Sequence, residues 1–287
     1  MPFSVLISFL LAQAAAGPAA EADALVRTVM VTVTDEKGAP IQGLVREEVA
    51  LVENGVAREI VSLQLDKRPL TLAFLVDTSE AIRNAYRLHV VDAVLDFLRG
   101  LPEGSRHAVW TTGDRPTKLV DFTDDPTAAD KSLRRVAPQG GSTLLDAIVE
   151  ASADLKKKEG ERSAIVILTA VGPEFSSAFR ERVVERAAGV AIVFLSLLVE
   201  EGATDLENRN NYDYVLSGLA RKSGGLFEVT LSAMGVDRGL KTLGAALAGQ
   251  YRLTYATPPD LKERKLEVTV ARPGARVRLP APPPKIR

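Results

Sequence analysis

The chain has 287 residues, with 36 Lys and Arg against 37 Asp and Glu, which gives a formal net charge of -1. This length fits about one or two domains, and the balanced charge excludes the broad basic surface that binds nucleic acid or an anionic membrane. The sequence has no cysteine, which excludes disulfides, zinc-thiolate sites and thiol catalysis.

An apolar leader opens the sequence. Residues 3–11 are apolar, small residues follow, and Ala14-Ala15-Ala16 offers a cleavage site, so we interpret residues 1–20 as a signal peptide. The alternative is an apolar anchor, but the run is shorter than the ~20 residues of an ordinary membrane-spanning helix. We therefore expect an exported chain that is periplasmic, attached to the cell surface or secreted, with no integral span after cleavage.

Two groups of short strands flank the centre of the chain. In residues 21–67, apolar alternation around Val31 and the turn-forming pair Asn54-Gly55 predict strands and a hairpin. In residues 249–280, "YRLTYA" and "KLEVTV" alternate in the same way. Because neither group can bury an apolar face alone, we predict that they pair into one β module. The proline-rich tail, residues 281–287, is predicted to be extended and exposed.

Residues 68–248 alternate apolar strands with helices. The predicted strands are 70–77, 106–113, 117–123, 163–172, 190–199 and 226–230. The predicted helices are 80–100, 140–160, 176–189, 212–225 and 239–248. This alternation predicts the α/β class, with a mostly parallel central sheet that helices cover on both faces. The α/β domain is then inserted between the halves of the β module or flanked by them.

Three segments that are distant in sequence should meet at one edge of this sheet. Asp77 follows a buried strand in "DTSEA", Thr143 begins a helix in "GGST", and Thr169 and Ala170 end a second buried strand in "LTAVG". In open α/β sheets, ligands bind beyond the carboxyl ends of the strands. This edge is therefore the candidate binding site.

These segments, in this order and spacing, resemble the von Willebrand factor type A domain over about residues 70–250. The resemblance implies a Rossmann-like fold that mostly binds proteins rather than catalysing reactions. It also implies a Mg²⁺ or Mn²⁺ site whose ligand shell a partner's carboxylate often completes. The flanking β segments resemble those of exported bacterial proteins with a related domain.

The family's metal ligands can be carried over position by position. Asp77 and Ser79 match the first two positions of the family's D-x-S-x-S motif, and Thr143 matches its threonine. Ala81 and Ala170 stand at the two other ligand positions and offer no side-chain oxygen. Since Mg²⁺ requires about six oxygen ligands, the resemblance implies an impaired, weakly binding site. Glu80 and Glu174 could substitute as ligands, but neither occupies a family position.

Two other interpretations of the same residues remain open. Asp77 and Glu80 are three residues apart, as are Thr143 and Asp146, and this spacing is typical of a helix capping box. Alternatively, the edge could be a polar contact site that works without metal.

A predicted acidic loop at residues 199–214 should lie on the same edge. Long loops within compact domains are often functional, although a plain solvated loop is the alternative. The candidate partner-binding residues are Glu80, Glu200, Glu201, Asp205 and Glu207.

The sequence therefore predicts an exported, adhesion-type module that binds a protein partner and needs no cofactor. No nucleophile and base signature supports an enzyme, and no basic surface supports a nucleic-acid partner. The alternative function is an architectural protein of the cell envelope whose sheet edge binds nothing.

Overall fold

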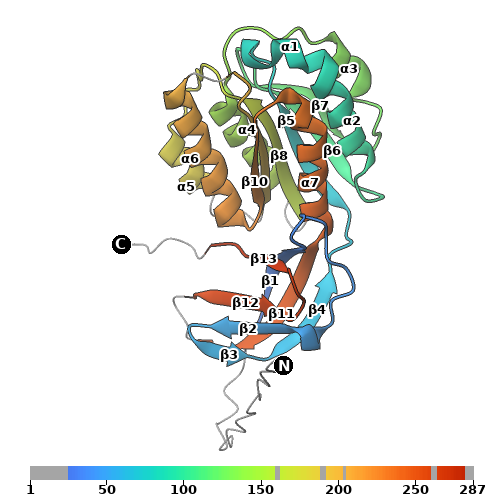
Figure 1. Cartoon of the computed structure of the whole chain (residues 1–287), viewed down its shortest axis with the longest axis vertical. Coiled ribbons are helices and arrows are strands. Elements are labelled where there is room, and N and C mark those ends of the chain that lie inside the picture. The colour runs from blue at the N-terminus through green and yellow to red at the C-terminus, as the bar shows by residue number, and fades with distance from the viewer. Residues whose placement is uncertain (1–24, 159–161, 188–191, 203–204, 260–263, 282–287) are drawn as a thin grey trace, which may run out of the picture.

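The computed structural model describes residues 25–158, 162–187, 192–202, 205–259 and 264–281. The predicted signal peptide, residues 1–20, and residues 282–287 of the predicted tail lie outside these ranges. Figure 1 shows an α/β domain stacked end to end on a smaller β module. In the part of the chain that the structure describes, no helix is both long and apolar enough to cross a membrane.

A six-stranded sheet forms the centre of the α/β domain, in the order β10-β9-β8-β5-β6-β7. Neighbouring strands pair in parallel except for β7, which runs antiparallel to β6. The strands are β5 (Leu70–Val76), β6 (Arg106–Thr111), β7 (Thr117–Thr123), β8 (Arg162–Ala170), β9 (Ile192–Val199) and β10 (Leu226–Thr230). The strand order turns back between β5 and β8, so the predicted binding edge lies at the topological switch point.

Helices cover both faces of this sheet, as the sequence predicts (Figure 1). One face is covered by α2 (Val91–Arg99), α3 (Asp130–Arg135) and α7 (Val236–Ala248). The other face is covered by α4 (Leu144–Lys156), α5 (Arg180–Ala187) and α6 (Leu206–Ser223). Strands β5 and β8 are buried along their whole length, which explains their continuous apolar sequence.

The first predicted helix is irregular before it becomes a regular α-helix at Val91. Its turns are η2 (Glu80–Ile82), α1 (Arg83–Ala85) and the π-helical η3 (Tyr86–Val90). Tyr86 and Val90 are nevertheless buried in the core on one face of the sheet. Such π-helical turns are frequent at functional sites, and this one lies at the binding edge.

The flanking strands form two sheets that share one core. Their orders are β13-β1-β11-β4 and β12-β2-β3. The elements are β1 (Leu25–Thr34), η1 (Arg46–Glu48), β2 (Val49–Glu53), β3 (Val56–Arg58), β4 (Ile60–Leu65), β11 (Gln250–Thr257), β12 (Leu266–Val270) and β13 (Arg276–Arg278). Strands from the two ends of the chain pair with each other in both sheets, and their inward side chains pack together.

One local prediction is wrong. The predicted loop 199–214 is much shorter, because α6 begins at Leu206, where Asp205 caps it by accepting a hydrogen bond from Asn208 N at 3.0 Å. Ala281, the one described residue of the predicted tail, donates from its N to Arg221 O at 3.0 Å. The short helix α3 has no counterpart among the predicted elements.

Candidate functional site

Asp77 lies at the carboxyl end of β5 and joins the two strands of the switch point. Its side chain is fully buried. Oδ1 accepts a hydrogen bond from Ser79 N at 2.8 Å. Oδ2 accepts bonds from Thr169 Oγ1 at 3.1 Å and from Ala170 N at 2.9 Å, both at the end of β8. The carboxylate thus holds the ends of β5 and β8 together.

Burial raises the pKa of Asp77, and the hydrogen bonds from Ala170 and Ser79 offset this only in part. The donors around it are neutral backbone and hydroxyl groups rather than a cation. A carboxyl group in such surroundings holds its proton more strongly than one in water.

The three predicted segments do meet at this edge. Gln139 N donates to Thr78 O at 3.0 Å and Glu80 N donates to Gly140 O at 2.9 Å, which joins the first and second segments. Ser142 N donates to Pro173 O at 2.8 Å, which joins the second and third. Backbone hydrogen bonds, rather than side chains alone, therefore fix the geometry of the edge.

Both predicted capping boxes are wrong. The helical turn after Asp77 has Ser79 at its N-cap with no side-chain capping bond, and Glu80 pairs with Arg83. Thr143 Oγ1 donates to Gly113 O at 2.8 Å instead of capping α4. Asp146 N bonds to Ser176 Oγ at 3.0 Å. Segments distant in sequence supply the partners that the local pattern assigned to the caps.

The residues at the family's ligand positions do not fit a divalent cation. Both oxygens of Asp77 already accept bonds from protein donors. Ser79 Oγ is buried without a hydrogen-bond partner, and Thr143 Oγ1 is turned to Gly113. Ala81 and Ala170 present methyl groups, and Mg²⁺ needs about six oxygens. Across the described ranges, no three His, Cys, Asp or Glu side chains lie close enough to hold a metal ion.

Glycine at position 172 is needed beside the missing third ligand. A Cβ at Gly172 would lie 2.7 Å from Ala81 Cβ, closer than real Cβ contacts come. Ala81 and Gly172 therefore pack as a pair where the family motif would place a hydroxyl, and the chain after β8 closes over that position.

A second buried polar group lies next to Asp77 and was not predicted as a unit. Tyr212 of α6 is fully buried and donates from its hydroxyl to Glu174 Oε2 at 2.9 Å. Burial raises the pKa values of both groups, and the charges of Glu174 and Asp77 raise that of Tyr212 further. Ser142 Oγ donates to Thr112 Oγ1 at 3.3 Å in the same region. Glu174 thus supports the edge from inside instead of replacing a metal ligand.

The five predicted partner-binding acids differ in their surroundings. Glu200 pairs with Arg209 at 2.8 Å, and Glu201 Oε2 accepts from Ala233 N at 2.8 Å. Asp205 is the cap of α6, whereas Glu80 and Glu207 are exposed. Three of these acids therefore form ion pairs or hydrogen bonds within the fold. Their position in a predicted loop could not reveal these contacts.

A cavity of about 330 Å³ opens beside Ala81 and Ala170 at this edge. Its wall includes Asn84, His89, Glu201 and Ala233. Several large apolar side chains near the carboxyl ends of the parallel strands are exposed, namely Leu88, Phe175, Phe179, Leu206, Leu231 and Met234. The edge thus combines a closed polar centre with an apolar rim, and only the polar centre was foreseen.

Comparisons with known proteins agree with this architecture. The family model of the von Willebrand factor type A domain matches residues 72–172, and a search of curated proteins finds no match. Proximal thread matrix protein 1 from the mussel byssus is similar in fold, with a TM-score of 0.53 and 18% identity. That alignment covers 69% of this chain and 49% of the mussel protein, so this chain spans about half the length of the mussel protein.

A von Willebrand factor type A protein from Catenulispora acidiphila aligns with a TM-score of 0.52 and 10% identity, over 88% of this chain and 72% of its own. Identities this low bear on the fold alone. Together with the strand order and the switch point at Asp77, the sequence match identifies the α/β domain of this chain as a member of the von Willebrand factor type A domain family.

Proposed function

We propose that this chain is a non-enzymatic module that binds a protein partner at the carboxyl edge of its α/β sheet without a metal ion. The observation that carries the proposal is the exposure of large apolar side chains around the cavity at this edge. Leu88 is 75% exposed, Leu231 77% and Met234 78%. Exposed apolar groups that gather in one place are typical of interaction sites.

The surroundings of the cavity support this placement. Leu88 adjoins His89 in the wall, and Leu231 and Met234 lie on either side of Ala233 in the sequence. Leu88 lies in η3 and Met234 in η4 (Ala233–Gly235), and these two turns contact each other. An apolar side chain of a partner could enter the cavity while the rim covers it, which is the arrangement of interface hot spots.

Metal independence is supported by the hydrogen bonds of Asp77. The donors Ser79 N, Thr169 Oγ1 and Ala170 N already occupy three of the roughly four lone-pair positions of this carboxylate, which leaves little of it for a cation. Burial of apolar surface, in contrast, needs no ion. We therefore propose that this member uses apolar contact where the family resemblance implies a shared metal.

We also propose that the module acts outside the cytoplasm, in the periplasm, at the cell surface or after secretion. The support for this location is the apolar leader with its small-residue cleavage site in residues 1–20.

The test is cross-linking capture of partners from cell envelopes with the full chain. Leu88→Asp and Met234→Asp place charges on the rim, and Val61→Asp is the matched control, because Val61 is 47% exposed on β4 of the β module. We expect the rim variants to capture at least tenfold less partner than the wild type, whereas the control variant and a chelator should leave the captured amount unchanged. Capture that survives both rim variants would favour the architectural alternative, and loss with chelator alone would overturn metal independence.

A further inference from the structure

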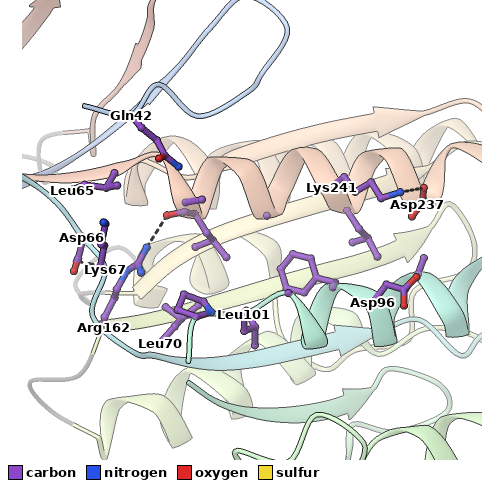
Figure 2. A pocket seen from close by; sticks show the side chains of 18 residues that line it. Gln42, Leu65, Asp66, Lys67, Leu70, Asp96, Leu101, Arg162, Asp237 and Lys241 are labelled. Atoms are coloured by element: carbon purple, nitrogen blue, oxygen red, sulfur yellow. Dashed lines mark hydrogen bonds and ion pairs between the residues drawn. The ribbon is translucent and has the colours of Figure 1, made fainter. Parts of the chain in front are cut away.

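A larger cavity, of about 460 Å³, lies at the opposite end of the sheet from Asp77. It opens between α2 and α7 and reaches the connection between β4 and β5 (Figure 2). Its apolar wall is formed by Leu70, Ala93, Phe97, Leu101, Leu240 and Leu247. The volume falls within the range of small-molecule sites, roughly 300–1,000 Å³.

Gly244 of α7 lines the space between the two helices. A Cβ there would lie 3.6 Å from Phe97 Cε2 of α2, which is an ordinary contact, so alanine would fit. A longer side chain at this position would extend into the space beside the phenyl ring.

One end of the cavity is lined by the buried cation of Arg162. The side chain of Arg162 is 6% exposed, and its Nη2 donates to Leu247 O at 2.7 Å and to Gln250 Oε1 at 2.9 Å. Its Nε has no hydrogen-bond partner and lies 3.6 Å from Asp66 Oδ2. Figure 2 shows Arg162, Asp66 and Lys67 together at this end.

The carboxylates that line the cavity are already neutralised. Asp66 accepts a two-point contact from Arg68, at 2.9 and 2.8 Å. Asp96 pairs with Arg99 and Asp237 pairs with Lys241, each at 2.7 Å. Arg162 and Lys67 then leave a positive excess at one end of an otherwise apolar space. Burial also lowers the pKa of Arg162, which an anion nearby would counteract.

We infer that this cavity binds a small amphipathic carboxylate, with its anionic head at Arg162 and Lys67 and its apolar body between α2 and α7. The charges of Arg162 and Lys67 attract the carboxylate head, and Phe97, Leu240 and Leu247 line the space for the body. A purely apolar ligand would leave these two cations without an anion at that end of the cavity. At about 30 Å³ for each water-sized unit, the cavity accommodates a ligand of up to roughly fifteen heavy atoms.

Decanoate, used below its micellar concentration, is a suitable probe, and decylammonium is its control of opposite charge. With the full chain, we expect saturable decanoate binding by calorimetry and a rise in melting temperature, because a ligand that binds the folded state stabilises it. Decylammonium should bind at least tenfold more weakly. Absence of decanoate binding, or equal binding of both amphiphiles, would overturn the inference.

Variants separate the two ends of the site. Gly244→Leu fills the part of the cavity that would hold the apolar body of the ligand, and it should abolish binding. Glu185→Leu adds the same side chain on the exposed face of α5 and should leave binding unchanged. Arg162→Gln should weaken binding about tenfold or more, as expected when a charged hydrogen bond is lost. If Arg162→Gln does not fold, Lys67→Ala tests the head from an exposed position. Unchanged affinity in Gly244→Leu would place the ligand elsewhere and refute the assignment.

Discussion

Asp77 and Arg162 are buried charged residues at opposite ends of two paired strands, and their surroundings differ in one respect. Both oxygens of Asp77 accept bonds from neighbouring donors, and no cation is among them. Arg162 lines a cavity and pairs with Asp66 Oδ2 only at 3.6 Å. A buried carboxylate whose two oxygens accept hydrogen bonds acts as structure, whereas a buried cation that lines an open space can attract a ligand of opposite charge. By this reasoning the carboxylate of Asp77 acts as a structural joint within its edge, and the opposite end has the features of a small-molecule pocket.

The largest effect should follow from breaking the joint at Asp77. Asp77→Ala would leave Ser79 N, Thr169 Oγ1 and Ala170 N without acceptors. Since each buried unsatisfied donor costs about 1–3 kcal/mol, we expect a loss of about 3 kcal/mol or more in the free energy of unfolding, measured with denaturant. Asp92→Ala, which breaks an exposed pair with Arg134, should cost less than about 0.5 kcal/mol. Equal losses of unfolding free energy in Asp77→Ala and Asp92→Ala would contradict the proposal that Asp77 joins the two strands.

The contact between Gly172 and Ala81 should give a smaller effect that can be reversed. Gly172→Ala places a Cβ 2.7 Å from Ala81 Cβ, and such overpacking costs about 1–3 kcal/mol. The double variant Gly172→Ala/Ala81→Gly removes the clash. It should recover most of the lost unfolding free energy, except for the cost of placing glycine at position 81. A double-mutant cycle in denaturant measures this coupling. If the effects of the two substitutions on the unfolding free energy simply add, Ala81 and Gly172 are not in the close contact described.

The two ends should also respond to pH with opposite sign. Burial raises the pKa of Asp77. Burial would raise that of Asp66 as well, but the hydrogen bond from Arg68 and the charge of Arg162 outweigh it, so the pKa of Asp66 is lowered. Stability from Asp77 is therefore fully present below the ordinary aspartate pKa of 3.8 and is lost as pH rises through its folded value. Stability from Asp66 is present above 3.8 and is lost as pH falls through its folded value.

Denaturation of the wild type, Asp77→Asn and Asp66→Asn between about pH 3 and pH 7 measures this contrast. As pH rises, the difference in unfolding free energy between wild type and Asp77→Asn should move against the wild type. The difference in unfolding free energy between wild type and Asp66→Asn should move in favour of the wild type. Slopes of the same sign would show that the two carboxylates do not differ in environment as the contacts indicate.

The smallest effect concerns metal. We expect millimolar Mg²⁺ or Mn²⁺, or a chelator, to leave the melting temperature of the wild type unchanged. An ion at 100 times its Kd would add about 2.7 kcal/mol, so real binding at this site would be easy to detect. A clear stabilisation that Asp77→Asn removes would show that the edge can rearrange to coordinate an ion.

Much of the architecture follows from the sequence alone. Continuous apolar runs such as 70–76 and 163–170 are typical of strands covered on both faces, and they alternate with amphipathic helices. The carboxyl ends of parallel strands share an edge, so the meeting of Asp77, Thr143 and Ala170 was predictable. The absence of side-chain oxygens at Ala81 and Ala170 is likewise visible without coordinates.

Only the tertiary structure decided which groups bond to which. Asp77 and Ala170 are 93 residues apart, and Arg162 and Gln250 are 88 apart. The capping-box spacing predicted that Glu80 N and Asp146 N bond to side chains three residues earlier. They donate instead to Gly140 O and Ser176 Oγ, which belong to other segments. Periodicity reports which face of an element is buried, because burial repeats with the geometry of that element. It cannot report hydrogen-bond partners or the space between α2 and α7, because these depend on how distant elements pack.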